Sequence, residues 1–443
     1  MRFQLEWLPR ASDDTPERAT AAEIGIRLAD GRCLTRVDDT FAQTIRETAR
    51  LSAYPLALWL VANWWRLRWE PVVDTPGWRM SHRLAAAGSG FVWPDIAFNS
   101  DGDVVQVSAR PTSGAAYESI VYLTGADVVV KAEAFVAAVD RFVETVVARL
   151  LATGHGSSDL VTLWKEVTEE RRDPELTRWR RLEAMMGYDP DESSPAEMSD
   201  LLAFEQEWGD DAIEDIAAAA KGRTVETIRT LMSEARPYAA AATVPDAVLI
   251  RVKDGLLGRD EHPWRAGYTL AKLARRQYGL DHGPIGTERL SEIFDVFADR
   301  ITHHPTASPC GAIFRGHPDA DELSIVLSAR SARSRRFEFV RLVGGHLADW
   351  SGDRLIAATR AKTARQKMQR AFAAEFLCPV EGLREMLGGQ PADEDFIDEA
   401  AERYDVSSEL VRRMIHNGGL DAAPEIARGL PVRSPEALDL YDV

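Results

Sequence analysis

The sequence predicts an α+β fold, in which a mixed N-terminal α/β unit is followed by an acidic helical connector and a C-terminal, mostly helical unit with a small sheet. Two kinds of periodicity support this class. Short segments alternate apolar and polar residues, and longer segments repeat apolar residues every three or four positions. Charge is unevenly distributed and divides the 443 residues into segments 1–155, 156–243 and 244–443. An apolar fraction of 45% is ordinary for a globular protein with a core.

Residues 1–155 are predicted to mix strands and helices. Residues 91–111 alternate apolar and polar side chains on both sides of Ser100-Asp101-Gly102-Asp103, which is typical of a hairpin with a glycine-containing turn. Residues 117–124 are a further strand candidate. Residues 132–154 place their apolar side chains on one face at helical spacing, which predicts a long helix.

Tryptophan is concentrated in this first segment, which holds 7 of the 12 tryptophans, six of them between Trp59 and Trp93. Such a cluster suits either a platform on which nucleic-acid bases stack or a packed core. The flanking residues are Leu, Val and Ala rather than Lys and Arg, and this favours the core.

Residues 156–243 carry 20 acidic and 10 basic side chains and are predicted to form helices. Apolar residues recur at helical spacing on both sides of Pro174, where one helix should end and the next begin. Further along, two helical segments flank a short turn at Lys221-Gly222, an outline compatible with a helix-turn-helix. The second of these helices offers only Arg223 and Arg229 as basic residues, so a packed helical hairpin is favoured over DNA recognition.

Residues 244–443 are predicted to combine a small sheet with helices. Strand-like segments occur at 247–252, 310–316 and 323–328, the last two on either side of a turn-like HPDADE. Helical periodicity extends over 262–280 and again over 335–384.

Composition limits the function classes open to the chain. A net charge of −17 argues against a sequence-independent nucleic-acid binder, whose affinity comes from neutralised phosphates. The longest apolar stretch, Leu56–Trp65, is about half of a membrane span, so no membrane association is expected. Three distant cysteines, Cys33, Cys310 and Cys378, provide no disulfide framework, and we therefore expect a cytoplasmic protein.

The sequence contains no motif for metal, phosphate or nucleophilic chemistry. None of the nine histidines lies four residues from another, so an H-E-x-x-H helix is absent, as are the glycine motifs of phosphate sites, dinucleotide sites and nucleophile elbows. The adjacent His303-His304 pair is interpreted as a polar loop feature. Pro94-Asp95 resembles the start of a PD-(D/E)xK nuclease site, but Gln106-Val107-Ser108 stands where an acid and a lysine are required. No metal or other cofactor is therefore expected.

Residues 263–420 contain several segments that match one known family in order. PWRAGYTLAKLARRQYGL is similar to the opening helix of that family, and CGAIFRG with LSIVLS to its paired strands. SRRFEFVRLVGGHLAD resembles its R-F-x-x-A-H-E-x-G-H helix, RAFAAEFLCPVEGLREML its N-x-F-A-A-x-L-L-M-P segment, and IDEAAERYDVSSELVRRMIHNGGL its closing helical hairpin. The chain thus resembles the ImmA/IrrE family of bacterial metallopeptidase-like proteins. This resemblance implies a zincin-like domain over residues 244–443.

The catalytic positions of that family do not carry over to this chain. Aligning Arg336-Phe337 with the family's R-F places Arg341 at the first zinc histidine, Leu342 at the general-base glutamate, Gly345 at the second histidine and Met368 at the third ligand. A shift of one residue makes His346 the second histidine but leaves Leu342 and Val343 at the other two positions. Zinc hydrolysis needs about three protein ligands and a base, and a guanidinium at the metal position opposes Zn²⁺ binding. The resemblance therefore implies a degenerate peptidase fold.

Two further sets of residues are candidate binding residues. One set lies on the two helices matched to the family's active site and would line its groove: Arg341, His346, Asp349 and Glu375. The plainer interpretation is that the two acids are solvated and that His346 packs or caps. In the terminal hairpin, Arg412 and Arg413 are candidates for DNA contact, because arginine can bind guanine, although their surroundings are acidic.

These observations predict a non-catalytic regulatory or adaptor protein whose partner is a protein or a ribonucleoprotein. Members of the resembled family act in stress response, prophage control, toxin–antitoxin modules and anti-phage defence, so the resemblance implies a setting of this kind. Two alternatives stay open. The first is an enzyme, either a peptidase with rearranged ligands or a nuclease-like activity in residues 1–155. The second is a sequence-specific DNA-binding regulator that uses the terminal hairpin or residues 223–236.

Overall fold

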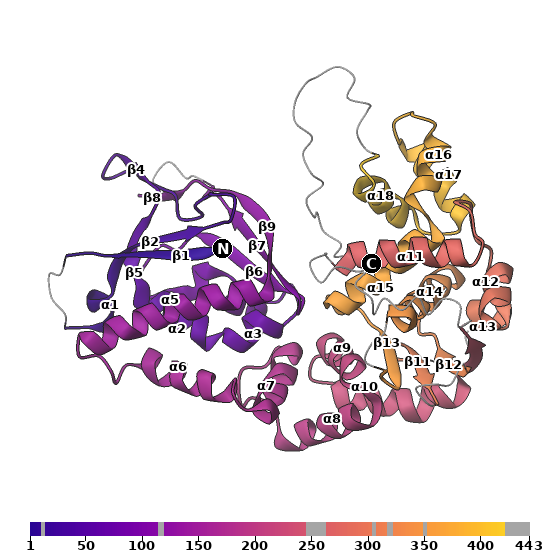
Figure 1. The fold of residues 1–443 in the computed structure, drawn as a ribbon, viewed down its shortest axis with the longest axis horizontal. Coiled ribbons are helices and arrows are strands. Elements are labelled where there is room, and N and C mark those ends of the chain that lie inside the picture. Colours follow the sequence, from indigo (N-terminus) through magenta and orange to yellow (C-terminus); the bar gives the residue numbers. More distant parts are fainter. Residues whose placement is uncertain are drawn as a thin grey trace. The chain divides into compact units, whose positions relative to one another are not determined.

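The computed structural model describes residues 1–9, 14–113, 119–244, 263–303, 307–316, 322–348 and 352–420. The chain divides into two compact units, Met1–Ser194 and Pro195–Val443, which are described separately (Figure 1). The acidic segment 156–243 is shared between them, because its first helices belong to the first unit and its later helices to the second. Both units combine helices with small antiparallel sheets, as expected for the α+β class. No helix among the described residues is long and apolar enough to cross a membrane.

The described part of the first unit contains three antiparallel sheets, in the strand orders β1-β2-β5, β4-β3-β8 and β6-β7-β9. The strands are β1 (Arg2–Trp7), β2 (Ala21–Arg27), β3 (Val37–Asp39), β4 (Thr44–Arg46), β5 (Ala49–Ser52), β6 (Asp95–Ser100), β7 (Val104–Arg110), β8 (Ile120–Tyr122) and β9 (Ala126–Lys131). The predicted hairpin is confirmed as β6 and β7. In its turn, Asp101 Oδ1 accepts hydrogen bonds from the amides of Asp103 (3.1 Å) and Val104 (2.9 Å).

Helices complete the core of the first unit. They are α1 (Pro16–Ala19), α2 (Ala53–Ala62), α3 (Trp64–Trp69), α4 (Pro76–His82), α5 (Ala132–Ala152), α6 (Asp159–Glu170) and α7 (Pro174–Met186), with a 3-10 turn at Leu84–Ala87. α5 confirms the long helix predicted from periodicity. α7 begins at the predicted break, where Asp173 caps it by accepting hydrogen bonds from the amides of Glu175 and Leu176.

The tryptophan cluster belongs to this core. Five of the six tryptophans between Trp59 and Trp93 are at most 8% exposed. Four of them, Trp59, Trp64, Trp65 and Trp93, belong to the apolar core around the sheets and α5, where Phe98 of β6 contacts both Trp59 and Phe135. The fifth, Trp78, stacks on His82. Rings buried in this way present no face on which a base could stack, so the core interpretation is confirmed for these five.

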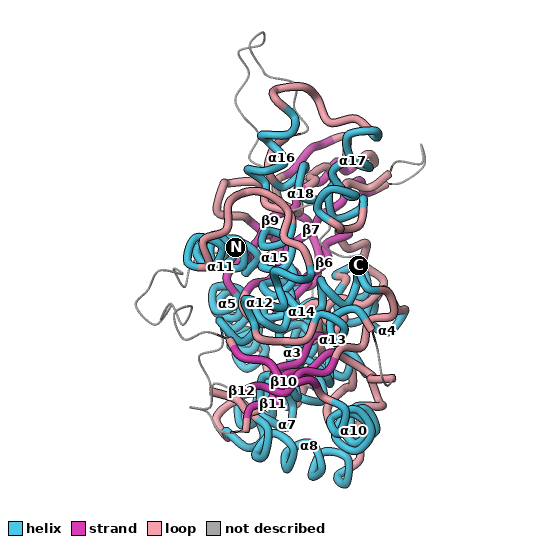
Figure 2. Tube along the Cα trace, turned by 90° about the vertical axis from the view of Figure 1, so that its right-hand side faces the viewer, coloured by secondary structure: helices cyan, strands magenta, loops and turns pink. Residues whose placement is uncertain are grey.

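The second unit contains an antiparallel sheet in the order β10-β12-β11-β13, of which Figure 2 shows β10, β11 and β12 side by side. The strands are β10 (Ala240–Thr243), β11 (Gly311–Arg315), β12 (Glu322–Val326) and β13 (Leu355–Ala358). β11 and β12 confirm two predicted strands, whereas the strand predicted at 247–252 and most of HPDADE lie outside the described residues. β13 corrects the continuous helical stretch predicted over 335–384. Its four apolar residues pair with β11, and so short a run gives no periodicity that separates strand from helix.

The helices of the second unit enclose one core with this sheet. They are α8 (Pro195–Trp208), α9 (Asp210–Ala220), α10 (Thr224–Thr230), α11 (Pro263–Gln277), α12 (Thr287–Phe294), α13 (Ala298–Thr302), α14 (Ala332–Ala348), α15 (Ala364–Leu377), α16 (Val380–Leu387), α17 (Glu394–Tyr404) and α18 (Ser408–Asn417). After α10 come a π turn at Leu231–Ala235 and a 3-10 turn at Arg236–Tyr238. α11, α14 and α15 pack closely. A Cβ added to Gly267 of α11 would lie 2.4 Å from the carbonyl oxygen of Met368, and one added to Gly344 of α14 would lie 2.4 Å from the Phe372 ring.

Candidate functional site

A polar network lies between α14, α15 and β13, and one member, Arg341, is the residue that the resemblance aligns with the first zinc histidine. Arg341 of α14 donates from Nη2 to the carbonyl oxygen of Thr359 (2.8 Å) and to Oε1 of Gln366 on α15 (2.6 Å). Burial lowers the pKa of Arg341 to about 10, which still leaves a full positive charge at neutral pH. The helix that would carry zinc ligands therefore presents a cation, held by a backbone carbonyl and a side-chain amide.

Gln366 connects Arg341 to β13 and α9. Its Oε1 also accepts a hydrogen bond from the amide of Thr359 (2.8 Å). Its Nε2 donates to the carbonyl oxygen of Ala357 (2.8 Å) and to Oδ2 of Asp215 on α9 (2.9 Å). Both polar atoms of this fully buried amide are thus engaged, and the network fixes its orientation.

Asp215 is a buried carboxylate compensated by several donors. Thr363 donates from Oγ1 to Oδ1 (2.6 Å), and Arg365 places Nε 3.3 Å from Oδ2. Arg365 also pairs with Asp211 (2.8 Å) and Glu214 (2.9 Å) of α9. Although burial opposes its charge, these three carboxylates raise the pKa of Arg365. Burial raises the pKa of Asp211 to about 6, and the neighbouring acids add to this effect while Arg365 opposes it.

The other residues aligned with the catalytic positions have packing roles. Leu342 is fully buried in the core, and Met368 packs against that core. A Cβ on Gly345 would lie 2.8 Å from Nε2 of Gln369 and 3.0 Å from Cγ2 of Ile356, so the position has no room for a larger side chain. Among the described residues, no group of three or more His, Cys, Asp or Glu side chains could hold a metal ion. The residues present do not fit the zinc site of the resembled family.

The predicted groove residues have separate partners in the structure. His346 accepts at Nδ1 from Arg315 of β11, at 3.2 Å from Nε and 2.8 Å from Nη2. Glu375 accepts from the amide of Val380 at the start of α16 (3.2 Å) and lies 3.8 Å from Nζ of Lys272. Asp349 lies outside the described residues.

The interpretation of Glu375 as a solvated helix acid is wrong, because the side chain is 1% exposed. That burial raises its pKa, against the effect of Lys272. Glu375 therefore has a structural role, because its carboxylate caps the first turn of α16 and lies near the ammonium group of Lys272. No periodicity or motif in the sequence distinguishes this buried acid from an acid on the surface.

Comparison with known proteins leaves the chain without a family assignment. No protein-family model or curated protein matches this sequence. The site is therefore interpreted from its own residues, and the resemblance to the ImmA/IrrE family remains a proposal.

Four arginines considered for DNA contact, two in each helical hairpin, are each paired with an acid. The pairs are Arg412 with Glu394, Arg413 with Glu409 (3.1 Å), Arg223 with Glu226 (2.9 Å) and Arg229 with Asp200 (2.8 Å). DNA contact would require each guanidinium to exchange a carboxylate for a phosphate or a base, and in the terminal hairpin further acids of α17 lie nearby. This arrangement does not favour DNA recognition by either hairpin.

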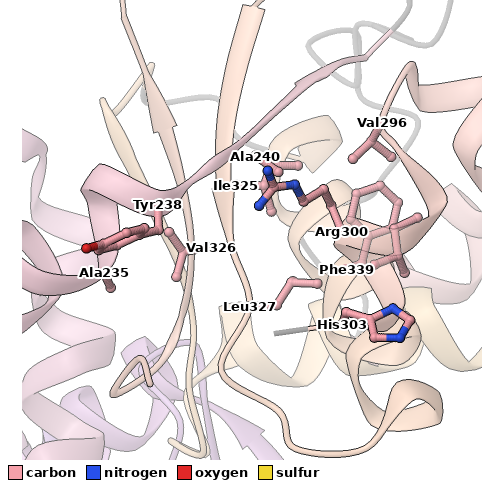
Figure 3. A pocket seen from close by; sticks show the side chains of 11 residues that line it. Ala235, Tyr238, Ala240, Val296, Arg300, His303, Ile325, Val326, Leu327 and Phe339 are labelled. Atoms are coloured by element: carbon pink, nitrogen blue, oxygen red, sulfur yellow. The ribbon is translucent and has the colours of Figure 1, made fainter. Parts of the chain in front are cut away.

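Figure 3 shows a pocket at the sheet edge that the sequence did not indicate. It encloses ≈ 450 Å³, its open mouth included, and is lined by Ala235, Tyr238, Ala240, Val296, Arg300, Ile301, His303, Ile325, Val326, Leu327 and Phe339. Most of the wall is apolar, and its polar side chains are Tyr238, Arg300 and His303 (Figure 3). His303, the first of the predicted histidine pair, lies at this pocket, whereas His304 is outside the described residues.

Proposed function

We propose that this chain is a non-catalytic regulatory or adaptor protein, built on a degenerate metallopeptidase fold of the ImmA/IrrE type. Its partner is a protein or a ribonucleoprotein in the bacterial cytoplasm. The stress, mobile-element or anti-phage setting of this proposal comes from the family resemblance alone.

The hydrogen bonds of Arg341 carry the argument against metal chemistry. A metallopeptidase needs uncompensated donor atoms that converge on an open position. Here the aligned helix offers a guanidinium. The carboxylate in the network, Asp215, already accepts hydrogen bonds from Thr363 and Gln366 and is paired with Arg365. The guanidinium of Arg341 is held by acceptors from the protein itself. This supports the proposal that the fold is kept for its shape and not for hydrolysis.

The alternative functions find less support in the contacts. A peptidase with rearranged ligands would need His346 and Glu375 on one metal, but His346 is bonded to Arg315 and Glu375 caps α16. A DNA-binding regulator would need free arginines on α18, and Arg412 and Arg413 are paired with acids. The adaptor proposal needs neither a metal nor a free basic face.

The test is a pull-down of the full chain, tagged at one end, from its native host, followed by reconstitution with the purified partner. Mass spectrometry identifies bound proteins, and an absorbance ratio detects nucleic acid. We expect one stoichiometric partner whose binding survives a chelator and the His346→Ala substitution. Cleavage of the partner, or loss of binding in a folded His346→Ala variant together with loss of a metal, would contradict the proposal.

A further inference from the structure

The strand β1 is an open edge of its sheet. It pairs with β2 from Arg2↔Arg27 to Trp7↔Ala22, and no strand among the described residues lies on its other side (Figure 1). The amide of Leu8 donates to the carbonyl oxygen of Ala21 (3.0 Å), so Leu8 and Ala21 form a hydrogen-bonded pair. Along antiparallel strands, hydrogen-bonded residue pairs alternate with pairs that are not hydrogen-bonded. The even-numbered residues of β1 therefore bond to β2. The amides and carbonyls of Phe3, Leu5 and Trp7 point to the open edge, which is a template for another strand.

The charged side chains of β1 face like charges on β2. Arg2 lies directly opposite Arg27, and Glu6 lies directly opposite Glu23. The two β2 residues are engaged elsewhere, Arg27 with Gln4 and Glu47, and Glu23 with Thr48 and Arg50. Among the described residues, neither Arg2 nor Glu6 has an ion-pair partner. Like charges directly opposite each other destabilise a strand pair, so β1 carries two charges that its own sheet does not compensate.

We propose that two copies of this chain pair through β1, antiparallel to each other, about a two-fold axis at Gln4. In this register Arg2 lies opposite Glu6 of the partner subunit, and Phe3 lies opposite Leu5 of the partner subunit. The pairing of Phe3 with Leu5 uses the free backbone groups, so it forms hydrogen-bonded pairs. Arg2 and Glu6 then form non-hydrogen-bonded pairs, in which side chains are closest. Two three-stranded sheets become one continuous sheet with closed symmetry.

Charge selects this register over its neighbours. Moving the axis to Phe3 or to Leu5 keeps the backbone pairing but places Arg2 opposite a neutral residue. Moving it to Arg2 or to Glu6 places like charges on the axis. Of these registers, only the one centred on Gln4 places each charged residue opposite a residue of opposite charge. The pattern Arg-x-Gln-x-Glu within β1 is therefore complementary to itself in an antiparallel pair.

A groove beside β1 has room for apolar side chains of the second copy. It encloses ≈ 570 Å³, its open mouth included, and is lined by Arg2, Phe3, Leu5, Ala138, Arg141, Phe142 and Thr145. Phe3 stacks on Phe142 of α5 with ring centroids 4.7 Å apart, so the apolar face of β1 is directed toward α5. Phe3 and Leu5 of the partner subunit emerge on that same face in the proposed register. Their burial in the groove adds a hydrophobic contribution to the strand pairing.

The first test is the mass of the full-length protein by sedimentation equilibrium at tens of micromolar. We expect twice the 49.1 kDa of one chain. Arg2→Glu and Glu6→Arg each convert two attractive pairs into two repulsive ones, and should raise the dissociation constant about ten-fold or more. A mixture of the two variants should pair again, because their charges are then opposite at every position. Glu166→Arg, the same charge change at an exposed residue of α6, should leave the mass unchanged.

The second test fixes the register. Gln4→Cys places two thiols opposite each other on the axis, so mild oxidation should give a disulfide-linked dimer. Glu166→Cys is the control and should stay uncrosslinked, and the natural cysteines are all buried. A wild-type protein that is monomeric, or charge variants that stay dimeric, would overturn the proposal. Failure of Gln4→Cys to crosslink in a protein of dimeric mass would overturn the register.

Discussion

Arg341 of α14 and Gln366 of α15 form a hydrogen bond of 2.6 Å between Nη2 and Oε1. The two helices are thereby linked at the depth where the resembled family would place its metal. Gln366 transmits the link to Asp215 of α9, so one buried amide joins three helices. These hydrogen bonds hold the three helices together, although Nε of Arg341 is buried without a partner.

Arg341→Ala tests the structural role of this link. We expect the free energy of unfolding to fall by about 1–3 kcal/mol, because the substitution removes one of the two donors to the Thr359 carbonyl and one of the two donors to Oε1 of Gln366. Chemical denaturation measures the change. Arg412→Ala is the matched control, since it removes only an exposed ion pair and should leave the free energy of unfolding almost unchanged. Equal stability of Arg341→Ala and the wild type would contradict the role assigned to the network. Partner binding should survive in the Arg341 variant unless its guanidinium contacts the partner.

Phe372→Ala tests the core between α11, α14 and α15. Phe372 is fully buried and stacks on Phe376 with centroids 5.4 Å apart, so truncation should cost about 3–5 kcal/mol. Phe297, which is 77% exposed, provides the comparison, and its truncation should change stability by about 0.5 kcal/mol or less. Thermal and chemical unfolding measure both variants. A small effect at Phe372 would mean that this core is not packed as described.

Gly267→Ala tests the close approach of α11 to α15. The new Cβ would lie 2.4 Å from the Met368 carbonyl oxygen and 2.9 Å from the Phe372 amide nitrogen, so the helices must separate. Overpacking of this kind should cost about 1–3 kcal/mol. Gly77 of α4 is also helical but has nothing within 4 Å of its added Cβ, and Gly77→Ala should be neutral or slightly stabilising. Equal outcomes for the two alanine variants would refute the close contact.

His82 makes the stability of the first unit depend on pH. It is fully buried, stacks on Trp78 with centroids 4.4 Å apart, and burial lowers its pKa to about 4 despite the nearby Glu70. The unfolded chain has a histidine pKa of about 6.5, so it binds the proton first as pH falls. Neutral His82 therefore contributes to the free energy of unfolding above about pH 6.5. This contribution is lost as the pH falls toward about 4, and the loss is on the order of 3 kcal/mol.

Urea denaturation between pH 7 and pH 4 checks this pH dependence, with His82→Phe as the variant that keeps the ring stack and removes the titration. The slope of stability against pH should be shallower in that variant. An NMR titration of His82 with a midpoint near 6.5 would contradict the burial argument.

Periodicity predicted the elements whose pattern is long enough to be distinctive. The 21 residues of α5 and the alternation in β6 and β7 are of this kind, since each pattern repeats over several turns or pairs. The four residues of β13 carry no such repeat, and their pairing with β11 is set by the tertiary fold. β1 was not predicted, although its six residues alternate polar and apolar side chains, because so short a run contains only three repeats of the period.

The sequence could predict some positions of the candidate site, but not the contacts between their side chains. The helical periodicity predicted that Arg341 lies in a helix, which is α14, and the spacing of Gln366 and Gln369 puts both amides on one face of α15. Asp215 lies 151 residues from Gln366, in an acidic segment with many equivalent carboxylates, and no local signal distinguishes it. Such pairings follow from packing and appear only in three dimensions.

The central claim, that this scaffold has exchanged a metal for a buried arginine, is tested most directly by the zinc content of the full-length protein. The protein is purified without chelators, dialysed, and analysed by elemental mass spectrometry beside a zinc peptidase as a positive control. The account predicts far less than one equivalent of zinc per chain, unchanged in His346→Ala. One equivalent that resists dialysis and is lost in His346→Ala or in Glu375→Gln would contradict it.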